Sequence, residues 1–463
     1  MNENKIDQFL RAGCRTHLVG IGGVSMAPLA EVLRGLGVHV TGSDMREGAA
    51  VAHLRTLGIP VTIGHLAGSV KGADCVIRTA AVHDDNPEIT AARSAGIPVF
   101  ERAQAWGALM SHYENALCVA GTHGKTTTTS MCTHIIMAAG MDPTVMIGGT
   151  LPLLGAGHRV GQGDTIIAES CEYCNSFLSF CPTVAVILNV EEDHLDFFKD
   201  LADIQRSFRA FARLVPEETG WVLVNGDNAH ALEAAEGCGR RLFRFSLSSP
   251  AADGRVEHLA WERGLPTFDV VIHGERYAHV SLRVGGEHNV SNALAAACAA
   301  WVLGVPGSAV EEGLDSFTGA GRRFEKKGTY HGADVYDDYA HHPDELHALL
   351  AMAKSLGYSR VVCAFQPHTY TRTAALFDRC VEELKGADVV LLAEIYAARE
   401  RNTIGISARD LAAKVPGSIF CPTLEEVTAR LRELARPGDL ILTVGAGDIV
   451  RAGEALVAAP PEG

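Results

Sequence analysis

Short apolar runs alternate with helix-like stretches along most of the chain, and this alternation predicts an α/β protein. The runs that we expect to form strands are rich in β-prone residues and fall at 16–19, 39–41, 74–78, 97–100, 116–121, 165–168, 184–189, 221–224, 334–337, 360–365, 388–393, 418–420 and 439–444. Helical segments are expected at 27–36, 127–139, 286–298, 343–355 and 374–384. Strands that alternate with helices in this way pair into mainly parallel sheets.

The length of the chain suggests about three domains. It has 463 residues, and 47% of them are hydrophobic, so each domain can have its own core. The first set of strands ends before residue 111, and the glycine-rich segment 317–324, with its basic pair, interrupts the pattern a second time. We therefore predict domains at 1–111, 112–320 and 321–463.

A phosphate-binding loop joins the strand at 116–121 to the helix that follows it. Its residues are Gly121, Thr122, His123, Gly124, Lys125, Thr126 and Thr127. Glycines let backbone N–H groups close around phosphate oxygens, the lysine neutralises charge, and the hydroxyl of Thr126 can reach a Mg²⁺ ion. The loop is two residues shorter than the standard G-x-x-x-x-G-K-[ST] pattern. ATP or GTP is the expected ligand.

A second glycine loop follows the first strand and opens the first helix. It consists of Gly20, Ile21, Gly22 and Gly23. Such a turn suits a pyrophosphate at a helix N-terminus, and Asp44, after the next strand, can accept a hydrogen bond from a ribose hydroxyl. Because Ser25 stands at the third glycine position, NAD is only one candidate among several nucleotide diphosphates.

Polar residues also follow the strands of the second domain. They are Glu169, Asp193-His-Leu-Asp196 and Asn225-Gly-Asp227. Ligands gather at the carboxyl ends of parallel strands, and a carboxylate beside a neutral imidazole can hold Mg²⁺. We assign Glu169 and His194 to a metal, with Glu172 as a competing ligand in the same short turn. For His194 the plain alternative is a hydrogen-bonded loop histidine.

Further candidates lie on the helix at 286–298 and in the third domain. His288 and Asn292 are four residues apart and share a helix face, so they are either purine contacts or ordinary polar residues. In the third domain, polar clusters follow four strands, at 338–343, 366–372, 394 and 445–448. Several such clusters at one edge of a sheet favour a binding face.

The net charge of -15 argues against general binding to nucleic acids or anionic membranes. No apolar stretch near the N-terminus is long enough for a signal peptide or a membrane span, so we expect a cytoplasmic protein. The twelve cysteines fall mostly in apolar runs, which is typical of small buried residues in a reducing compartment. Cys171 and Cys174 form a C-x-x-C without a second pair at zinc spacing, and we assign them no metal or redox role.

Seven motifs occur in the order found in the bacterial Mur ligases. They are Gly20-Ile-Gly-Gly, Gly121-Thr-His-Gly-Lys-Thr-Thr-Thr, Asp193-His-Leu-Asp, His288-Asn-Val-Ser-Asn, Gly321-Arg-Arg-Phe, Tyr336-Asp-Asp-Tyr-Ala-His-His-Pro and Phe365-Gln-Pro-His-Thr-Tyr-Thr-Arg-Thr373. The sequence resembles this family over nearly its whole length. The resemblance implies an N-terminal Rossmann-like UDP-binding domain, a central P-loop ATPase-like domain with a mostly parallel sheet, and a C-terminal Rossmann-like domain that closes with the amino acid.

The resemblance also implies roles for individual residues. It implies that Lys125 and Thr126 contact the ATP phosphates and a Mg²⁺ ion, and that Glu169 and His194 bind a second Mg²⁺ ion. Further contacts with ATP are implied for His288, Asn292, Arg323 and Asp338. His341, His368 and Arg372 would lie near the transferred phosphate and the alanine carboxylate. Some members have arginine where Thr369 stands, so carboxylate binding would depend more on Arg372. For the first glycine loop, the resemblance favours a UDP-sugar over NAD.

The activity that the resemblance implies is an ATP-dependent ligation in peptidoglycan precursor synthesis. L-alanine would be joined to the lactyl carboxylate of UDP-N-acetylmuramate through an acyl phosphate, with Mg²⁺ as cofactor and with His341 or His368 removing the amine proton. The enzyme would be a monomer or weak homodimer with small-molecule partners. A recycling ligase that attaches a preformed murein tripeptide remains an alternative, although the segment 366–372 favours free alanine. A NAD-dependent oxidoreductase is a further alternative, but it leaves the phosphate loop without a role.

Overall fold

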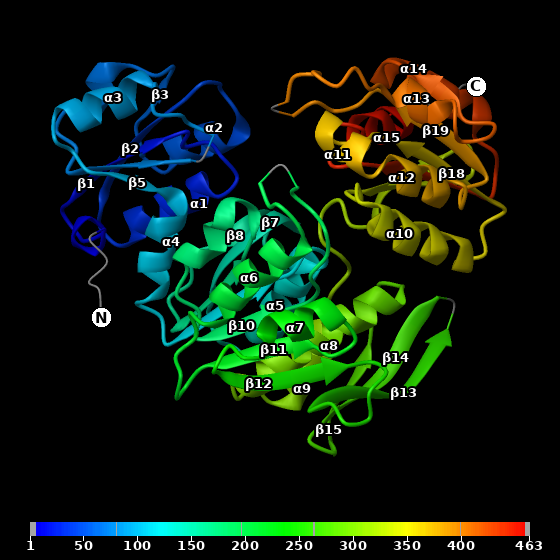
Figure 1. The fold of residues 1–463 in the computed structure, drawn as a ribbon, viewed down its shortest axis with the longest axis horizontal. Helices are drawn as coiled ribbons and strands as arrows, with labels where there is room; N and C mark the ends of the chain where they lie inside the picture. Colours follow the sequence, from blue (N-terminus) through cyan, green and yellow to red (C-terminus); the bar gives the residue numbers. More distant parts are fainter. Residues whose placement is uncertain (1–5, 80, 196, 263, 399, 459–463) are drawn as a thin grey trace.

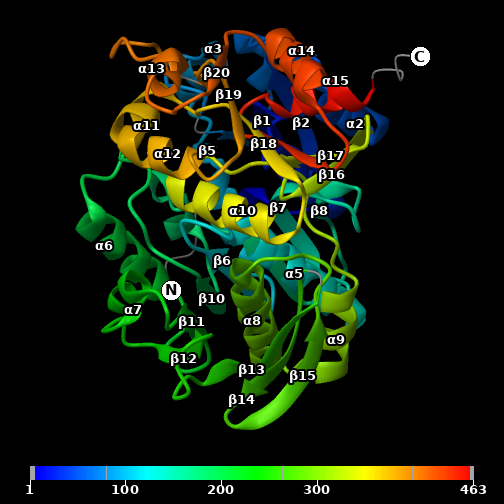
Figure 2. The ribbon, with the colours of Figure 1, turned by 90° about the vertical axis from the view of Figure 1, so that its right-hand side faces the viewer.

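The computed structural model describes residues 6–79, 81–195, 197–262, 264–398 and 400–458. They form three α/β lobes, each built on its own sheet. Figures 1 and 2 show that the N-terminal and C-terminal lobes both lie on one side of the central lobe. Within these described ranges, none of the helices combines the length and the apolar character needed to cross a bilayer.

The N-terminal lobe has a five-stranded parallel sheet in the order β3-β2-β1-β4-β5. Its strands are β1 (Arg15–Val19), β2 (His39–Asp44), β3 (Val61–Ile63), β4 (Cys75–Arg78) and β5 (Val99–Glu101). Its helices are η1 (Asp7–Phe9), α1 (Met26–Gly35), α2 (Ala49–Thr56), η2 (Ala67–Val70), α3 (Pro87–Ser94) and α4 (Arg102–Met110). The predicted strand at 39–41 is too short, because Gly42 and Ser43 also pair with β1 and β3. Asp44 is therefore the last residue of β2.

The central lobe has a ten-stranded sheet in the order β15-β14-β13-β12-β11-β10-β6-β9-β7-β8. Its strands are β6 (Asn115–Ala120), β7 (Thr144–Leu151), β8 (Ala156–Arg159), β9 (Thr165–Glu169), β10 (Val184–Ile187), β11 (Trp221–Asn225), β12 (Arg241–Ser246), β13 (Gly254–Glu262), β14 (Leu265–Ile272) and β15 (Glu275–Ser281). Its helices are α5 (Lys125–Ala138), η3 (Tyr173–Ser179), α6 (Leu201–Ala212), α7 (Ala229–Ala235), α8 (Glu287–Val302) and α9 (Gly307–Asp315).

The run β13-β12-β11-β10-β6-β9-β7 in this sheet is parallel. Strands β14 and β15 at one edge and β8 at the other edge are antiparallel to their neighbours. These edges were not predicted from the sequence, and neither were β7, β12 and β13. Most of β13 is exposed or half-buried, so it lacks the apolar run by which we recognised the interior strands. The helix after the phosphate loop begins at Lys125, two residues before the predicted start, because Gly124 takes a left-handed conformation (φ 81°) and caps it.

The C-terminal lobe has a six-stranded sheet in the order β16-β17-β21-β18-β19-β20, with only β16 antiparallel. Its strands are β16 (Glu325–Tyr330), β17 (Ala333–Asp338), β18 (Arg360–Phe365), β19 (Val389–Ala393), β20 (Ile419–Cys421) and β21 (Asp439–Val444). Its helices are α10 (Pro343–Ser355), α11 (Tyr370–Ala375), α12 (Phe377–Leu384), α13 (Ala408–Ala412), α14 (Leu424–Leu434) and α15 (Val450–Val457). The single helix predicted at 374–384 is wrong: two helices meet at Leu376, and Arg372 lies on the first of them.

Candidate functional site

The phosphate loop is held against the end of β10. The backbone N–H of His123 donates to Asn189 Oδ1 at 2.7 Å, and the N–H of Thr122 donates to the Asn189 carbonyl at 3.1 Å. Gly121 has a φ of 149°, and a Cβ there would lie 2.9 Å from the Leu188 side chain. Only glycine fits at this point, so the loop geometry depends on it.

Lys125 lies inside the loop and forms a buried ion pair. Its Nζ donates to the carbonyls of Gly121 and Thr122 and lies 3.1 Å from Glu172 Oε2, and Glu172 is only 2% exposed. Burial by itself lowers the pKa of Lys125, but the carboxylates of Glu172 and Glu169 outweigh this effect and raise it above its ordinary value. The ammonium group is therefore charged, and it balances the carboxylate of Glu172.

The predicted metal ligands fall into two neighbouring groups. Thr126 Oγ1 donates to Glu169 Oε1 at 3.1 Å, and Glu169 Oε2 accepts from the Gly148 N–H at 2.7 Å. These oxygens fit Mg²⁺, which prefers oxygen ligands and a nearby phosphate. His194 lies instead beside Asp193, with Nε2 3.7 Å from Asp193 Oδ2, and against the ring of Tyr173. Asp196, the last residue of the Asp193-His-Leu-Asp196 motif, lies outside the described residues.

A cavity of about 950 Å³ lies between the central and C-terminal lobes, next to the phosphate loop. It gathers Gly124, His288, Asn292, Arg323 and Asp338, which the sequence analysis assigned to ATP. Asn292 accepts a hydrogen bond from Thr128 on α5, which fixes α8 beside the loop. Asp338 accepts from two backbone N–H groups, and burial raises its pKa to about 6.

Several residues that line this cavity had no predicted role. Lys326, Tyr336 and Glu345 line it together with Asn225 and Asp227. Glu345 is the most connected of them, since Oε1 lies 3.1 Å from His123 Nδ1 and 3.7 Å from the Arg323 guanidinium. Its position three residues after His342 is a capping-box signal, which marks a helix start and does not by itself indicate a site.

Arg372 connects the C-terminal lobe to the central lobe. Its Nε and Nη2 donate to Asp193 Oδ1 at 3.2 and 3.0 Å, and Nη1 lies 3.0 Å from His368 Nδ1. The His368 ring stacks on Tyr396 and lies 5.7 Å from the ring of His341. Arg372 is therefore paired with the central lobe through Asp193.

The first glycine loop folds back onto Asp44. The N–H groups of Gly20 and Ile21 donate to the Ser43 carbonyl, and the N–H of Gly22 donates to Asp44 Oδ2 at 2.8 Å. A Cβ at Gly22 would lie 2.9 Å from that same oxygen, so a larger residue would displace the loop. Asp44 thus positions the loop, in addition to any contact with a sugar nucleotide.

Two histidines at the junction of the lobes are neutral at pH 7. Burial lowers the pKa of His341 and of His368 to about 4. The folded protein binds protons at these two histidines less readily than the unfolded chain, in which histidines titrate near 6.5. The contribution of the two neutral rings to the free energy of unfolding is therefore complete above pH 6.5 and is lost as the pH falls toward 4. Neutral imidazoles are also the form that can accept a proton.

We expect the free energy of unfolding to fall by about 2 kcal/mol per buried histidine between pH 6.5 and 5. Urea unfolding at the two pH values should show a smaller loss for His341→Gln than for the unmodified protein. His347→Gln is the matched control, since that ring is 70% exposed on α10. Equal losses in the two variants would contradict burial as the cause.

The fold and the site define a class of protein: a three-lobed nucleotide-dependent enzyme whose phosphate loop faces a histidine and arginine cluster from another lobe. Family models match the chain at residues 15–114 (Mur ligase family, catalytic domain), 119–300 (Mur ligase middle domain) and 322–447 (Mur ligase, glutamate ligase domain). The chain belongs to the Mur ligase family.

Individual relatives cover nearly the whole chain. The UDP-N-acetylmuramate–L-alanine ligase of Acetivibrio thermocellus is 44% identical over 95% of this chain and 94% of its own length. The structure of UDP-N-acetylmuramate-alanine ligase MurC from Thermotoga maritima superposes with a TM-score of 0.79 at 29% identity, covering 96% of this chain and 98% of that one. A murein peptide ligase from Psychrobacter arcticus shares the fold, with a TM-score of 0.71 at 24% identity over 96% and 100% of the two chains.

Proposed function

We propose that this protein joins L-alanine to the lactyl carboxylate of UDP-N-acetylmuramate, consuming ATP and releasing ADP and phosphate, in peptidoglycan precursor synthesis. The observation that carries the proposal is the junction at which Arg372, His368 and His341 lie across from the phosphate loop. In this proposal residues 1–111 bind the UDP-sugar, 112–320 bind ATP, and 321–463 bind the amino acid. ATP and UDP-sugars are cytoplasmic metabolites, so the activity is assigned to the cytoplasm.

The proposed chemistry follows from charge. A carboxylate is a poor acyl donor, so the γ-phosphoryl group of ATP is first moved onto the lactyl carboxylate to give an acyl phosphate. Lys125 offsets the negative charge on the phosphates during this transfer, a type of stabilisation commonly worth several kcal/mol. The alanine amine then attacks the acyl carbon and gives its proton to His341 or His368, and phosphate leaves. Closure of the lobes keeps water from the acyl phosphate.

Magnesium is the implied cofactor, and its bound form would spread the charge of the transferring phosphoryl group. The Thr126 hydroxyl would hold one ion beside the ATP phosphates, and Glu169, which accepts a hydrogen bond from Thr126, would hold a second ion together with His194. Glu172 is bonded to Lys125 instead, which supports Glu169 over Glu172 as the ligand.

We therefore expect Glu169→Gln to raise the Mg²⁺ concentration for half-maximal activity by about tenfold or more, and Glu172→Gln to raise it less. Magnesium titrations of ADP release measure both values, and melting temperatures show whether each variant is folded. A larger increase for Glu172→Gln would reverse the assignment.

The proposed function is tested by ADP release with UDP-N-acetylmuramate and a panel of amino acids. Alanine should support the fastest release, with serine and glycine as the closest competitors. Release that requires the murein tripeptide would favour the recycling ligase. Reduction of NAD without ADP release would favour the oxidoreductase.

A further inference from the structure

A smaller cavity of about 400 Å³ also lies between the central and C-terminal lobes. Residues that line it include His123, Glu191, Glu192, His230, Asp344 and Arg379. The three carboxylates outnumber the one arginine, so the cavity favours a cation. Its walls come from two lobes, and His123 brings the phosphate loop to it.

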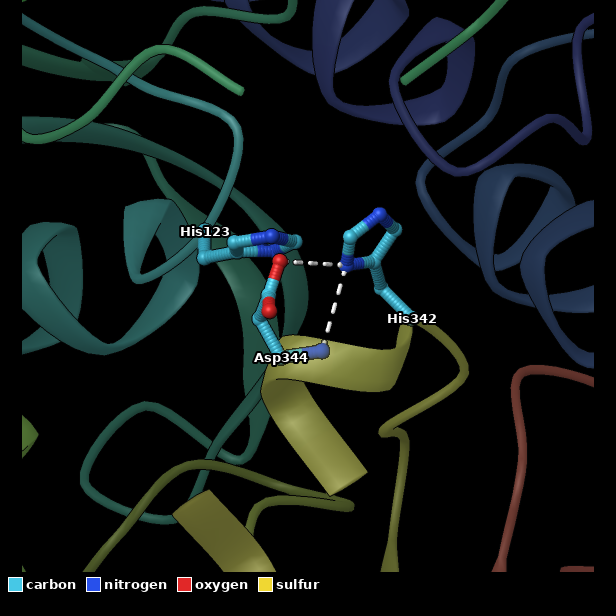
Figure 3. Close-up of side chains that lie close together, drawn as sticks. All are labelled: His123, His342 and Asp344. Carbon is cyan, nitrogen blue, oxygen red and sulfur yellow. Dashed lines mark hydrogen bonds and ion pairs between the residues drawn. The ribbon is translucent and has the colours of Figure 1, made fainter. Parts of the chain in front are cut away.

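Two residues that line this cavity, His123 and Asp344, lie close to the buried side chain of His342 (Figure 3). One ligand atom of His123, one of His342 and one of Asp344 all lie within 4.8 Å of one another. In the described part of the chain, no other group of three histidine, cysteine, aspartate or glutamate residues comes this close. His342 Nδ1 is already 3.2 Å from Asp344 Oδ2. Ligand atoms around tetrahedral zinc lie roughly 3.4 Å apart, given bonds of about 2.1 Å, so small side-chain rotations complete the geometry.

The hydrogen bonds of the two rings leave nitrogen atoms suited to a metal. His123 Nδ1 pairs with Glu345 Oε1 at 3.1 Å, so this nitrogen carries the proton, and in the neutral ring Nε2 keeps its lone pair. That Nε2 atom is buried and lacks a hydrogen-bond partner among the described residues. A carboxylate on the far nitrogen is the usual support of a metal-binding histidine.

The ring of His342 offers a second lone pair. His342 is completely buried, and its Nδ1 accepts a long hydrogen bond of 3.3 Å from the Asp344 N–H. A nitrogen that accepts this bond is unprotonated, and a metal ion would take its single lone pair in place of this long hydrogen bond. Asp344 is half exposed, with its side chain 45% accessible, so an ion can reach the group from solvent.

We propose that His123, His342 and Asp344 form a binding site for one Zn²⁺ ion, which ties the phosphate loop to the start of α10. Two imidazoles and a carboxylate suit zinc, whereas Mg²⁺ prefers oxygen ligands. The three protein ligands leave a fourth position for water. The site shares no residue with the Mg²⁺ positions proposed at Thr126 and at Glu169 with His194, and Zn²⁺ bound there opposes separation of the lobes.

Zinc titration of the full, untagged chain without nucleotide tests the proposal, with a chromophoric chelator as competitor. All proteins carry Cys171→Ser and Cys174→Ser, which removes the exposed thiols as rival ligands. His342→Asn removes the ring but keeps a residue that caps a helix well, and Asp344→Asn keeps the size of the side chain. His342→Asn and Asp344→Asn should each lower the zinc affinity of the site by at least about tenfold, and Glu345→Gln should lower it by about 10- to 100-fold.

His347→Asn is the matched control on the same helix and should bind zinc as the parent does. A Co²⁺ spectrum typical of tetrahedral coordination should appear in the parent and vanish in His342→Asn. Zinc binding that is unchanged in both His342→Asn and Asp344→Asn would overturn the proposal. Circular dichroism and melting temperatures show whether each variant is folded. If the buried His342→Asn variant does not fold, the result for Asp344→Asn, at a half-exposed position, decides the test.

Discussion

Replacing Lys125 by methionine is expected to lower kcat by about 10³-fold or more, because the variant loses the charge that offsets the phosphates during transfer. The structure adds a second effect. Lys125 also balances Glu172, and breaking a buried ion pair on one side costs about 3–5 kcal/mol. A lower melting temperature should therefore accompany the loss of activity.

A double variant separates these two effects. Lys125→Met with Glu172→Gln removes both charges and should recover most of the melting temperature while activity stays lost. Single-turnover measurements of acyl phosphate formation locate the defect at the transfer step. Recovery of activity in the double variant would show that Lys125 serves folding and not phosphoryl transfer.

The next largest effect is expected at Arg372, where Arg372→Lys should raise the KM for alanine almost as much as Arg372→Ala, by about tenfold or more. An arginine forms a planar pair of hydrogen bonds with a carboxylate, and lysine cannot reproduce it. The KM values for ATP and UDP-N-acetylmuramate should stay close to normal, because the other two lobes are proposed to hold those ligands.

Asp193 supplies the control for this experiment. It accepts two hydrogen bonds from Arg372, so Asp193→Asn weakens the bridge between the lobes and keeps the arginine. If Arg372 only bridges the lobes, both variants should change the three KM values alike. A selective rise for alanine in Arg372→Lys alone supports the carboxylate role. Arg430→Lys, on the exposed face of α14, should leave all values unchanged.

The parts of the fold that were predicted correctly are those with strong local signals. Interior strands such as β10 and β21 are buried along their whole length and appear as apolar runs. Strand β13, third from one edge of its sheet, escaped prediction because it alternates weakly and is exposed over most of its length. The break between α11 and α12 at Leu376 was missed for a related reason, since no proline or glycine marks it.

The sequence by itself determined the α/β class, the two glycine loops and the family, because glycine positions, strand ends and motif order are local properties. Only the tertiary structure decided which charged groups meet. Lys125 and Glu172 are 47 residues apart, Asp193 and Arg372 are 179 apart, and His123 and Glu345 are 222 apart. No local pattern encodes such pairs. They arise because the lobes bring separate loops together, and there burial strengthens each charge interaction and makes an unpaired partner costly.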